Sequence, residues 1–164
     1  MSCGVNAVSM DDLYSKPGYL FRRAQQIAVA IFMEECAAQA LTPVQYAALV
    51  AIREHAGLDA TRLSALVAFD RSTLGDVLER LEQRGLILRQ PSPQDKRVKL
   101  LFPTPRGRKL LTEVMPAMER AQARMLAPLM PGDRQTLLRL LGELVEANNE
   151  VSRAPLRMSA GKRG

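Results

Sequence analysis

The chain has 164 residues, with 23 Lys and Arg against 17 Asp and Glu, a net charge of +6 and 47% hydrophobic residues. This length fits one domain with extensions, which can bury roughly 70% of the surface that the unfolded chain exposes. The composition excludes an intrinsically disordered chain. Because no apolar run reaches about 18 residues, we expect neither a membrane-spanning helix nor a membrane partner.

Residues 17–57 predict two helices. Apolar residues at helical spacing predict a long helix over residues 17 to about 40, with two adjoining apolar stripes: Leu20, Phe21, Ala24, Ile27, Ala28, Ile31 and Phe32. Thr42 and Gln45 then have the spacing of a capping box, with Pro43 at the first helical position. The second helix is expected to end at Gly57.

Residues 59–85 have the spacing of a helix-turn-helix. Asp59 is a candidate N-cap for a short helix over residues 60–68, and Asp70 for a helix that runs to Arg84. The inward stripe of the second helix comprises Leu74, Val77, Leu78 and Leu81. Its outward face comprises Arg71, Ser72, Thr73, Gly75, Asp76, Glu79 and Arg80. Small polar residues at the start of such a helix suit the major groove of DNA, whereas an amphipathic helix hairpin with a solvated face is the alternative.

A polar loop over residues 90–97 lies between two strand-like runs, Leu86–Arg89 and Val98–Phe102. A hairpin directly after a recognition helix, with Lys96 and Arg97 near its tip, has the form of a wing that places a guanidinium in the minor groove. Charged loops are usually only solvated. Because this loop carries the densest bases in the chain, we favour DNA contact.

Two further helices are predicted after the wing. Thr104 as N-cap and Pro105 predict a helix to about Leu129 that Pro116 should kink, and Asp133 is the candidate cap of a last helix. Apolar residues keep helical spacing in both: Leu110, Leu111, Val114, Met118, Met125 and Leu126, then Leu137, Leu138, Leu140, Leu141, Leu144 and Val145. The last stripe is broad for one protomer to cover, so burial favours pairing with a second chain; an intramolecular bundle is the alternative.

The positive surplus lies in two segments. Residues 60–109 hold eleven bases and five acids, and residues 153–164 hold four bases and no acid, so the rest of the chain sums to −4. Charge gathered in this way is the distribution expected of a nucleic-acid footprint. The predicted partner is therefore double-stranded DNA.

The chain lacks the motifs of common enzymes and metal sites. Cys3 and Cys36 are far apart in the sequence, no Cys-x-x-Cys occurs and His55 is the one histidine, so we expect no bound metal. There is no glycine-rich dinucleotide motif, P-loop or Gly-x-Ser-x-Gly, so we expect no cofactor and no enzyme activity. The N-terminus has no basic segment followed by an apolar run, which makes a reducing cytoplasm the default location.

The order of four short motifs resembles the MarR family of winged-helix transcriptional regulators: Asp70-Arg71-Ser72-Thr73, Leu81-Glu82-Gln83-Arg84-Gly85-Leu86-Ile87, Asp95-Lys96-Arg97 and Thr104-Pro105-Arg106-Gly107. The similarity extends over Leu13–Val151. It implies an obligate homodimer with interlocking N- and C-terminal helices, in which each protomer presents one winged helix to half of a pseudo-palindrome. It also implies that Arg97 enters the minor groove while Asp95 orients it. The predicted DNA-binding residues are Arg71, Ser72, Thr73, Asp76, Arg80, Asp95, Lys96, Arg97 and Lys99.

The sequence departs from the family pattern in two places. Gly75 and Asp76 stand where polar or basic residues are common, which predicts a different base preference and lower phosphate affinity. Glycine costs ~1 kcal/mol relative to alanine in a helix interior, and either close approach of the backbone to DNA or a crowded contact with another helix would explain it. Pro103 replaces a leucine and should end the second wing strand, because proline cannot donate to the ladder.

The first helix contains a candidate ligand site. Tyr19, Arg22, Arg23 and Gln26 are spaced to lie along one side of it. An arginine fork binds a carboxylate through two hydrogen bonds. In family members that sense aromatic acids, the similar stretch contributes a carboxylate-binding arginine, so the resemblance implies Arg22 first and Arg23 second. Salt-bridged or exposed side chains are the alternative.

These observations predict a mainly α protein with a small β-hairpin, a winged helix-turn-helix domain flanked by dimerisation helices. Its parts are an N-terminal arm with the first dimerisation helix (1–41), the winged domain (42–104), C-terminal dimerisation helices (105–152) and a basic flexible tail (153–164). The predicted function is a ligand-responsive homodimeric repressor, released from its operator by a small aromatic carboxylate. Two alternatives stay open: a redox-responsive regulator using Cys36, although Glu34 and Glu35 would disfavour its thiolate, and a helical interaction protein that does not bind DNA.

Overall fold

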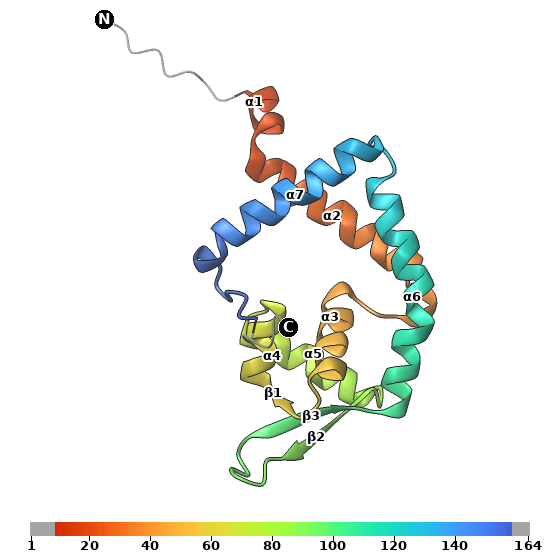
Figure 1. Cartoon of the computed structure of the whole chain (residues 1–164), viewed down its shortest axis with the longest axis vertical. Helices are drawn as coiled ribbons and strands as arrows, with labels where there is room; N and C mark the ends of the chain where they lie inside the picture. Colours follow the sequence, from red (N-terminus) through yellow and green to blue (C-terminus); the bar gives the residue numbers. More distant parts are fainter. Residues whose placement is uncertain (1–8, 159–164) are drawn as a thin grey trace, which may run out of the picture.

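The computed structural model describes residues 9–158, so Cys3 and the two chain ends, 1–8 of the predicted arm and 159–164 of the predicted tail, lie outside it. The elements in chain order are α1 (Met10–Ser15), α2 (Pro17–Glu35), η1 (Ala37–Gln39), α3 (Pro43–Glu54), β1 (Leu58–Asp59), α4 (Ala60–Val67), α5 (Arg71–Gln83), β2 (Ile87–Pro91), β3 (Lys99–Pro103), α6 (Pro105–Leu126), α7 (Pro131–Ala147) and η2 (Asn149–Val151). Figure 1 shows α3, α4, α5 and the sheet gathered in one half of the molecule, with α2 and α7 in the other half and α6 spanning both.

The three helices of the winged domain begin at the predicted caps. The Thr42 hydroxyl accepts the Gln45 backbone N–H at 3.2 Å, and the Gln45 side chain accepts the Thr42 N–H at the same distance, which completes a capping box. Asp59 accepts the Arg62 N–H at 2.8 Å, and Asp70 caps α5 in the same way. These caps are confirmed because each is set by local side-chain chemistry alone.

The core of the winged domain lies between α3, α4, α5, the sheet and the first half of α6. Its fully buried side chains are predominantly leucines and other aliphatics that lie on the inward stripes: Leu49, Ile52, Leu63, Leu74, Leu81, Leu86, Ile87, Leu101, Leu111 and Val114. The predicted inward stripe of α5 is buried along its whole length. The helix-turn-helix is thus packed as its hydrophobic pattern indicates.

The sheet has one strand more than the predicted hairpin. Its order is β1-β3-β2, all antiparallel, with Ile87 paired to Pro103 and Leu58 paired to Leu101. Pro103 is the last residue of β3, as expected for a residue without a backbone donor. The two-residue strand β1 is too short to give a periodic signal, and only pairing with β3 creates it.

The first long helix ends earlier than predicted. Helix α2 stops at Glu35, and η1 follows, with Ala40 in the left-handed region at φ 48°. The chain turns here because Leu41, which is fully buried, has to reach the core. The Arg84 guanidinium donates to the carbonyls of Ala40 at 2.7 Å and Gln39 at 2.8 Å, which satisfies backbone oxygens that a continued helix would have used.

The C-terminal helices also differ at their ends. Helix α6 runs without a break through Pro116 but ends at Leu126 instead of Leu129. Helix α7 begins with Met130 as N-cap and Pro131 at its first position, so Asp133 lies in the first turn and is not the predicted cap. The ring of Pro131 fixes a φ angle that suits the first residue of a helix, so α7 begins two residues before Asp133.

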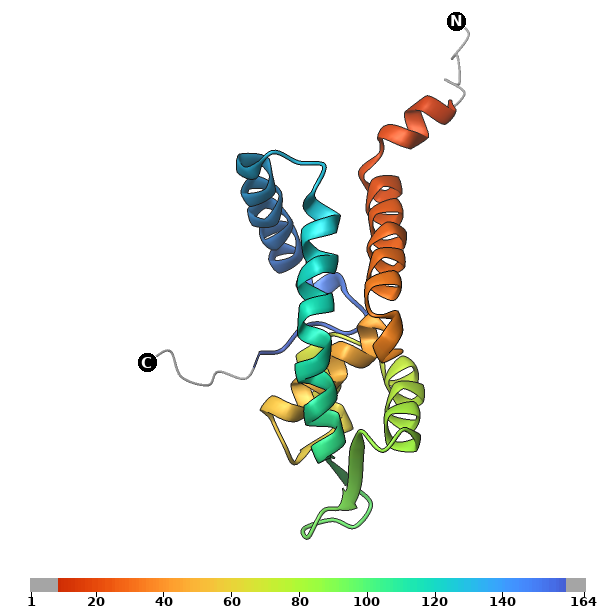
Figure 2. The ribbon, with the colours of Figure 1, turned by 90° about the vertical axis from the view of Figure 1, so that its right-hand side faces the viewer.

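Helices α2 and α6 pack side by side and carry the winged domain (Figure 2). Arg120 of α6 contacts Glu35 at 3.0 Å, and Arg124 contacts Glu34 at 2.7 Å. The short helix α1, which the sequence analysis did not predict, precedes them and has its own capping box between Ser9 and Asp12. No helix in residues 9–158 is long and apolar enough to cross a membrane.

Candidate nucleic-acid interface

The N-terminus of α5 is organised by Asp70. Its carboxylate accepts the Thr73 backbone N–H at 2.9 Å, the Ser72 hydroxyl at 2.7 Å and the Thr73 hydroxyl at 3.1 Å. These hydrogen bonds lower the pKa of Asp70 from 3.8 to about 2, and the bond from the Ser72 side chain has the largest effect. The two predicted DNA-contacting hydroxyls are therefore held in place as donors to Asp70, and each keeps lone pairs that can accept a hydrogen bond.

All five predicted contact residues of α5 are exposed: Arg71, Ser72, Thr73, Asp76 and Arg80. Gly75 lies among them, and a Cβ added there would meet nothing within 4 Å. Crowding by another helix of the described chain therefore does not explain this glycine. Close approach of the helix backbone to DNA stays the prediction.

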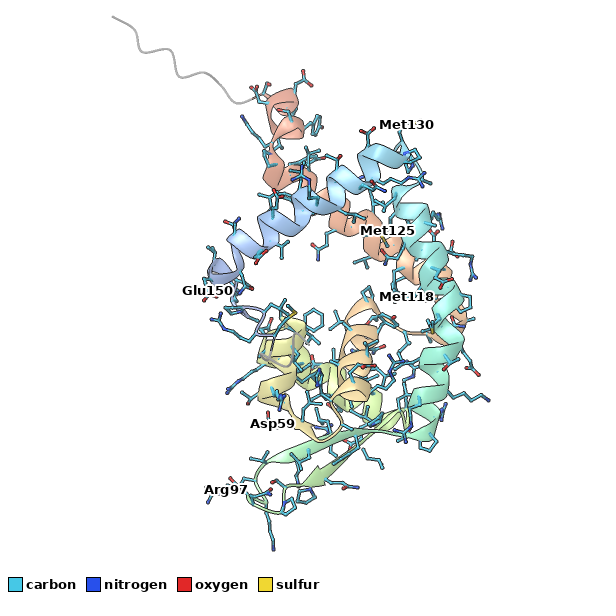
Figure 3. The ribbon with its side chains drawn as sticks, in the orientation of Figure 1. Asp59, Arg97, Met118, Met125, Met130 and Glu150 are labelled. Carbon is cyan, nitrogen blue, oxygen red and sulfur yellow. The ribbon has the colours of Figure 1, made fainter. Side chains whose placement is uncertain are left out.

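The wing is a closed hairpin with its cations at the tip. Ser92 is buried and donates its backbone N–H to the Val98 carbonyl at 2.9 Å, which closes the loop. The Asp95 carboxylate accepts the Arg97 backbone N–H at 2.9 Å, so Asp95 shapes the turn through the backbone of Arg97. Figure 3 shows Arg97 at the tip, far from α2 and α7. Asp95, Lys96, Arg97 and Lys99 are all exposed.

Three of the eleven bases in residues 60–109 serve the fold. Arg84 binds the backbone carbonyls after α2, Arg89 of β2 contacts Glu82 of α5 at 2.6 Å, and Lys109 lies 3.6 Å from Glu113. The Arg89–Glu82 ion pair connects strand β2 of the wing to helix α5. The cationic surface is consequently smaller than the sequence count indicates, because charge alone does not show which bases are paired within the chain.

The four predicted ligand residues form two separate pairs on α2. The Arg23 guanidinium donates to the Gln26 side chain at 3.0 Å, and the Arg22 guanidinium lies 5.1 Å from the centre of the Tyr19 ring. Only Tyr19 is partly buried, and Arg22, Arg23 and Gln26 are exposed. The four side chains therefore do not form one common binding site in this structure.

A groove of about 630 Å³ lies between α2 and the outer face of α5, and none of the four predicted ligand residues is part of its lining. Helix α2 contributes Gln25, Val29 and Met33, which the sequence analysis missed, and the start of α3 and Phe69 complete the lining. From α5 come Thr73, Asp76 and Arg80. The α2 residues have regular helical spacing, a signal that could have been found, but only the tertiary structure shows what they face.

Cys36 is buried at the end of α2. Burial first, and then the Glu35 carboxylate, raise the pKa of its thiol above the ordinary value. Because the thiolate is the reactive form, this environment favours a packed structural cysteine over a peroxide sensor. Within residues 9–158, no three His, Cys, Asp or Glu side chains are grouped so that they could hold a metal ion.

Comparison with known proteins agrees with this architecture. The sequence pattern of the MarR family matches residues 41–99. A putative transcriptional regulatory protein for the hcr operon of Thauera aromatica is 33% identical over 82% of this chain and 81% of its own length. The transcriptional repressor NicR of Pseudomonas putida is 29% identical over 85% of this chain and 89% of its own.

A solved structure is similar as well. Bordetella bronchiseptica BpsR, whose DNA binding is regulated by 6-hydroxynicotinic acid, superposes with a TM-score of 0.74 and 32% identity over 80% of this chain and 94% of its own. Fold, sequence pattern and relatives therefore agree. The chain belongs to the MarR family of winged-helix proteins, and it is a DNA-binding transcriptional regulator rather than an enzyme.

Proposed function

We propose that the chain is a homodimeric repressor that binds a pseudo-palindromic operator and is released by a small aromatic carboxylate. The observation that carries this proposal is that Thr73, Asp76 and Arg80 belong both to the outward face of α5 and to the groove against α2. A ligand in that groove touches the same side chains that face DNA. Repression by NicR and regulation of BpsR by 6-hydroxynicotinic acid support the same type of function.

The apolar faces of α2 and α7 support a homodimer. Helix α7 buries none of its residues, and it exposes Leu138, Leu140, Leu144 and Val145. Helix α2 likewise exposes Leu20, Phe21 and Ile27 outside the groove. A helix of this length gains most of its stability from packing of an apolar face, so α7 needs a second surface to cover it. Another copy of the chain offers that surface on its own α2.

The exposed residues of α5 and the wing support readout of both grooves. The lone pairs of the Ser72 and Thr73 hydroxyls can accept from the exocyclic amino groups of adenine or cytosine in the major groove. Arg97 would enter the adjacent minor groove, where narrow A·T-rich sequence concentrates negative potential. Two such units in a dimer read half-sites about 34–36 Å apart.

Arg22 is the first candidate for the effector carboxylate. It lies three residues before Gln25 and seven before Val29, so it continues the groove-lining stripe by one turn. Arg80 offers a second guanidinium inside the groove. Arg23 is engaged with Gln26 and lies on a different side of α2.

Titration of aromatic acids into a DNA complex tests this proposal. We would use a duplex selected from a random-sequence pool by the wild-type chain, and add 6-hydroxynicotinate, benzoate and 4-hydroxybenzoate. At least one acid should lower DNA affinity, because release requires that it bind the free protein more tightly than the complex. Arg22→Gln should remove the response, whereas Arg23→Gln should retain it.

Two results would contradict the proposal in different ways. If no acid changes DNA affinity and Arg22→Gln is silent, the effector is wrong while DNA binding stands. If the wild-type chain shows only weak, unsaturable attraction to every duplex, the interaction-protein alternative replaces the repressor.

A further inference from the structure

The segment after α7 returns to the helix-turn-helix. Figures 1 and 3 show the chain turning near Glu150 and descending to α4. The backbone N–H of Arg157 donates to the Ala65 carbonyl in the last turn of α4, at 2.7 Å. This segment, residues 152–158, is the C-terminal strap. The strap is thus attached to the winged domain, although it follows α7 in the chain.

Two interactions hold the strap in shape. The Asn149 side chain accepts the Leu156 backbone N–H at 2.8 Å and donates to the Leu156 carbonyl at 3.2 Å, so it pairs with the strap as another backbone would. Arg157 forms a two-pronged ion pair with Glu150, which raises the pKa of the guanidinium and lowers that of the carboxyl. Arg157 therefore acts as an anchor whose charge is already compensated.

A cavity of about 370 Å³ lies between the strap and the start of α5, and Arg71 and Arg153 both line it. Within residues 9–158, neither guanidinium has a salt bridge or a side-chain hydrogen bond to another residue. Asp70, which also lines the cavity, is already occupied by Ser72 and Thr73. Arg71 and Arg153 come from distant parts of the chain and line one cavity beside α5 together with the ionised Asp70 carboxylate, so the lining carries more positive than negative charge.

From this arrangement we infer that residues 152–158 form a basic arm that binds the phosphate backbone of DNA next to α5, with Arg153 as its principal contact. The inference rests on the proposed binding of operator DNA. A guanidinium suits a phosphodiester because it can donate two parallel hydrogen bonds. In the sequence, residues 159–164 add Lys162 and Arg163 and no acid.

The salt dependence of DNA binding tests the charge of the arm. Affinity for the selected duplex and for a scrambled duplex is measured in the full chain and in Arg153→Gln between 50 and 200 mM salt. Loss of one phosphate contact should reduce the slope of log affinity against log salt by about 0.9, so the deficit of the variant shrinks about threefold over this range. Both duplexes should be affected alike. Lys16→Gln, which removes one charge between α1 and α2, is the matched control and should leave the slope unchanged.

A second variant tests the placement of the arm. Asn149→Ala keeps every charge and removes both hydrogen bonds to Leu156, so it should also weaken binding to both duplexes. The arm is overturned if Arg153→Gln behaves like Lys16→Gln, or if either variant binds DNA more tightly than the wild-type chain. The proposed position of the arm beside α5 is overturned if Asn149→Ala binds both duplexes with wild-type affinity. In each case the wild-type chain still binds the selected duplex, which separates failure of the arm from failure of the proposed function.

Discussion

Arg97 at the wing tip concentrates the specificity of the proposed interface in one side chain. Because Asp95 holds its backbone and not its guanidinium, the side chain is free to enter a groove. Arg97→Ala should reduce affinity for the selected duplex by about 1–3 kcal/mol and weaken the preference for A·T-rich minor grooves. Competition binding with duplexes that differ only under the wing measures this. Lys96→Ala should weaken binding to all duplexes equally. If the two variants behave identically, Arg97 is not the specific minor-groove contact.

Asp70 makes the recognition helix sensitive to acid. Its pKa is about 2 in the folded chain against an ordinary 3.8, so the folded state favours the ionised carboxylate. This stabilisation is fully present above the ordinary value and is lost as the pH falls towards 2. Asp70→Asn retains a capping oxygen without the charge. Denaturant unfolding between pH 5 and 2 should therefore show that the wild-type chain has a higher free energy of unfolding than Asp70→Asn at pH 5, and that this difference disappears as the pH falls to 2. A difference that does not depend on pH would show that the charge of Asp70 is not its cause.

At the scale of elements, two glycines with opposite surroundings separate packing from DNA contact. A Cβ on Gly107 would clash with the Leu86 carbonyl where α6 begins against β2, whereas a Cβ on Gly75 meets nothing. Gly107→Ala should lower the free energy of unfolding by about 1–3 kcal/mol. Gly75→Ala should raise it by up to ~1 kcal/mol, because alanine is the better helix former.

The DNA affinity of Gly75→Ala completes this comparison. If the α5 backbone approaches DNA closely at Gly75, the added methyl group should weaken binding although the protein is more stable. Fluorescence anisotropy with the selected duplex measures the affinity, and thermal unfolding measures the stability. Unchanged affinity would show that the glycine serves no close approach, and it would leave this departure from the family pattern without a structural reason.

Over the whole molecule, the proposed homodimer would bury the exposed apolar faces of α2 and α7, so we expect its assembly to contribute to the stability of the chain. Leu144→Glu places a charge in the apolar stripe of α7 and should convert a dimer into a monomer with lower helix content. Sedimentation and circular dichroism measure the two effects. Gln135→Glu adds the same charge at an exposed polar position of α7 and should remain dimeric. A wild-type chain that is monomeric at micromolar concentration would contradict the dimer itself.

The sequence by itself determined the elements whose signals are local. The caps at Thr42, Asp59 and Asp70 and the inward stripe of α5 needed no tertiary information, because a side chain three residues away satisfies the backbone or because helical periodicity selects the face. The wing was recognisable for the same reason, since two short strands flank a polar loop. These local signals were sufficient for the fold class, whereas the DNA contacts of individual residues stay a prediction.

Only the tertiary structure decided the features that join distant segments. The strand β1 exists through its pairing with β3, and α2 ends early because Leu41 has to be buried and Arg84 satisfies the freed carbonyls. The groove between α2 and α5, and the return of the strap to α4, have no local signature. Neither the partner of a helix face nor the pairing of a surface arginine is encoded within a few residues, since both depend on which segments the closed core brings together.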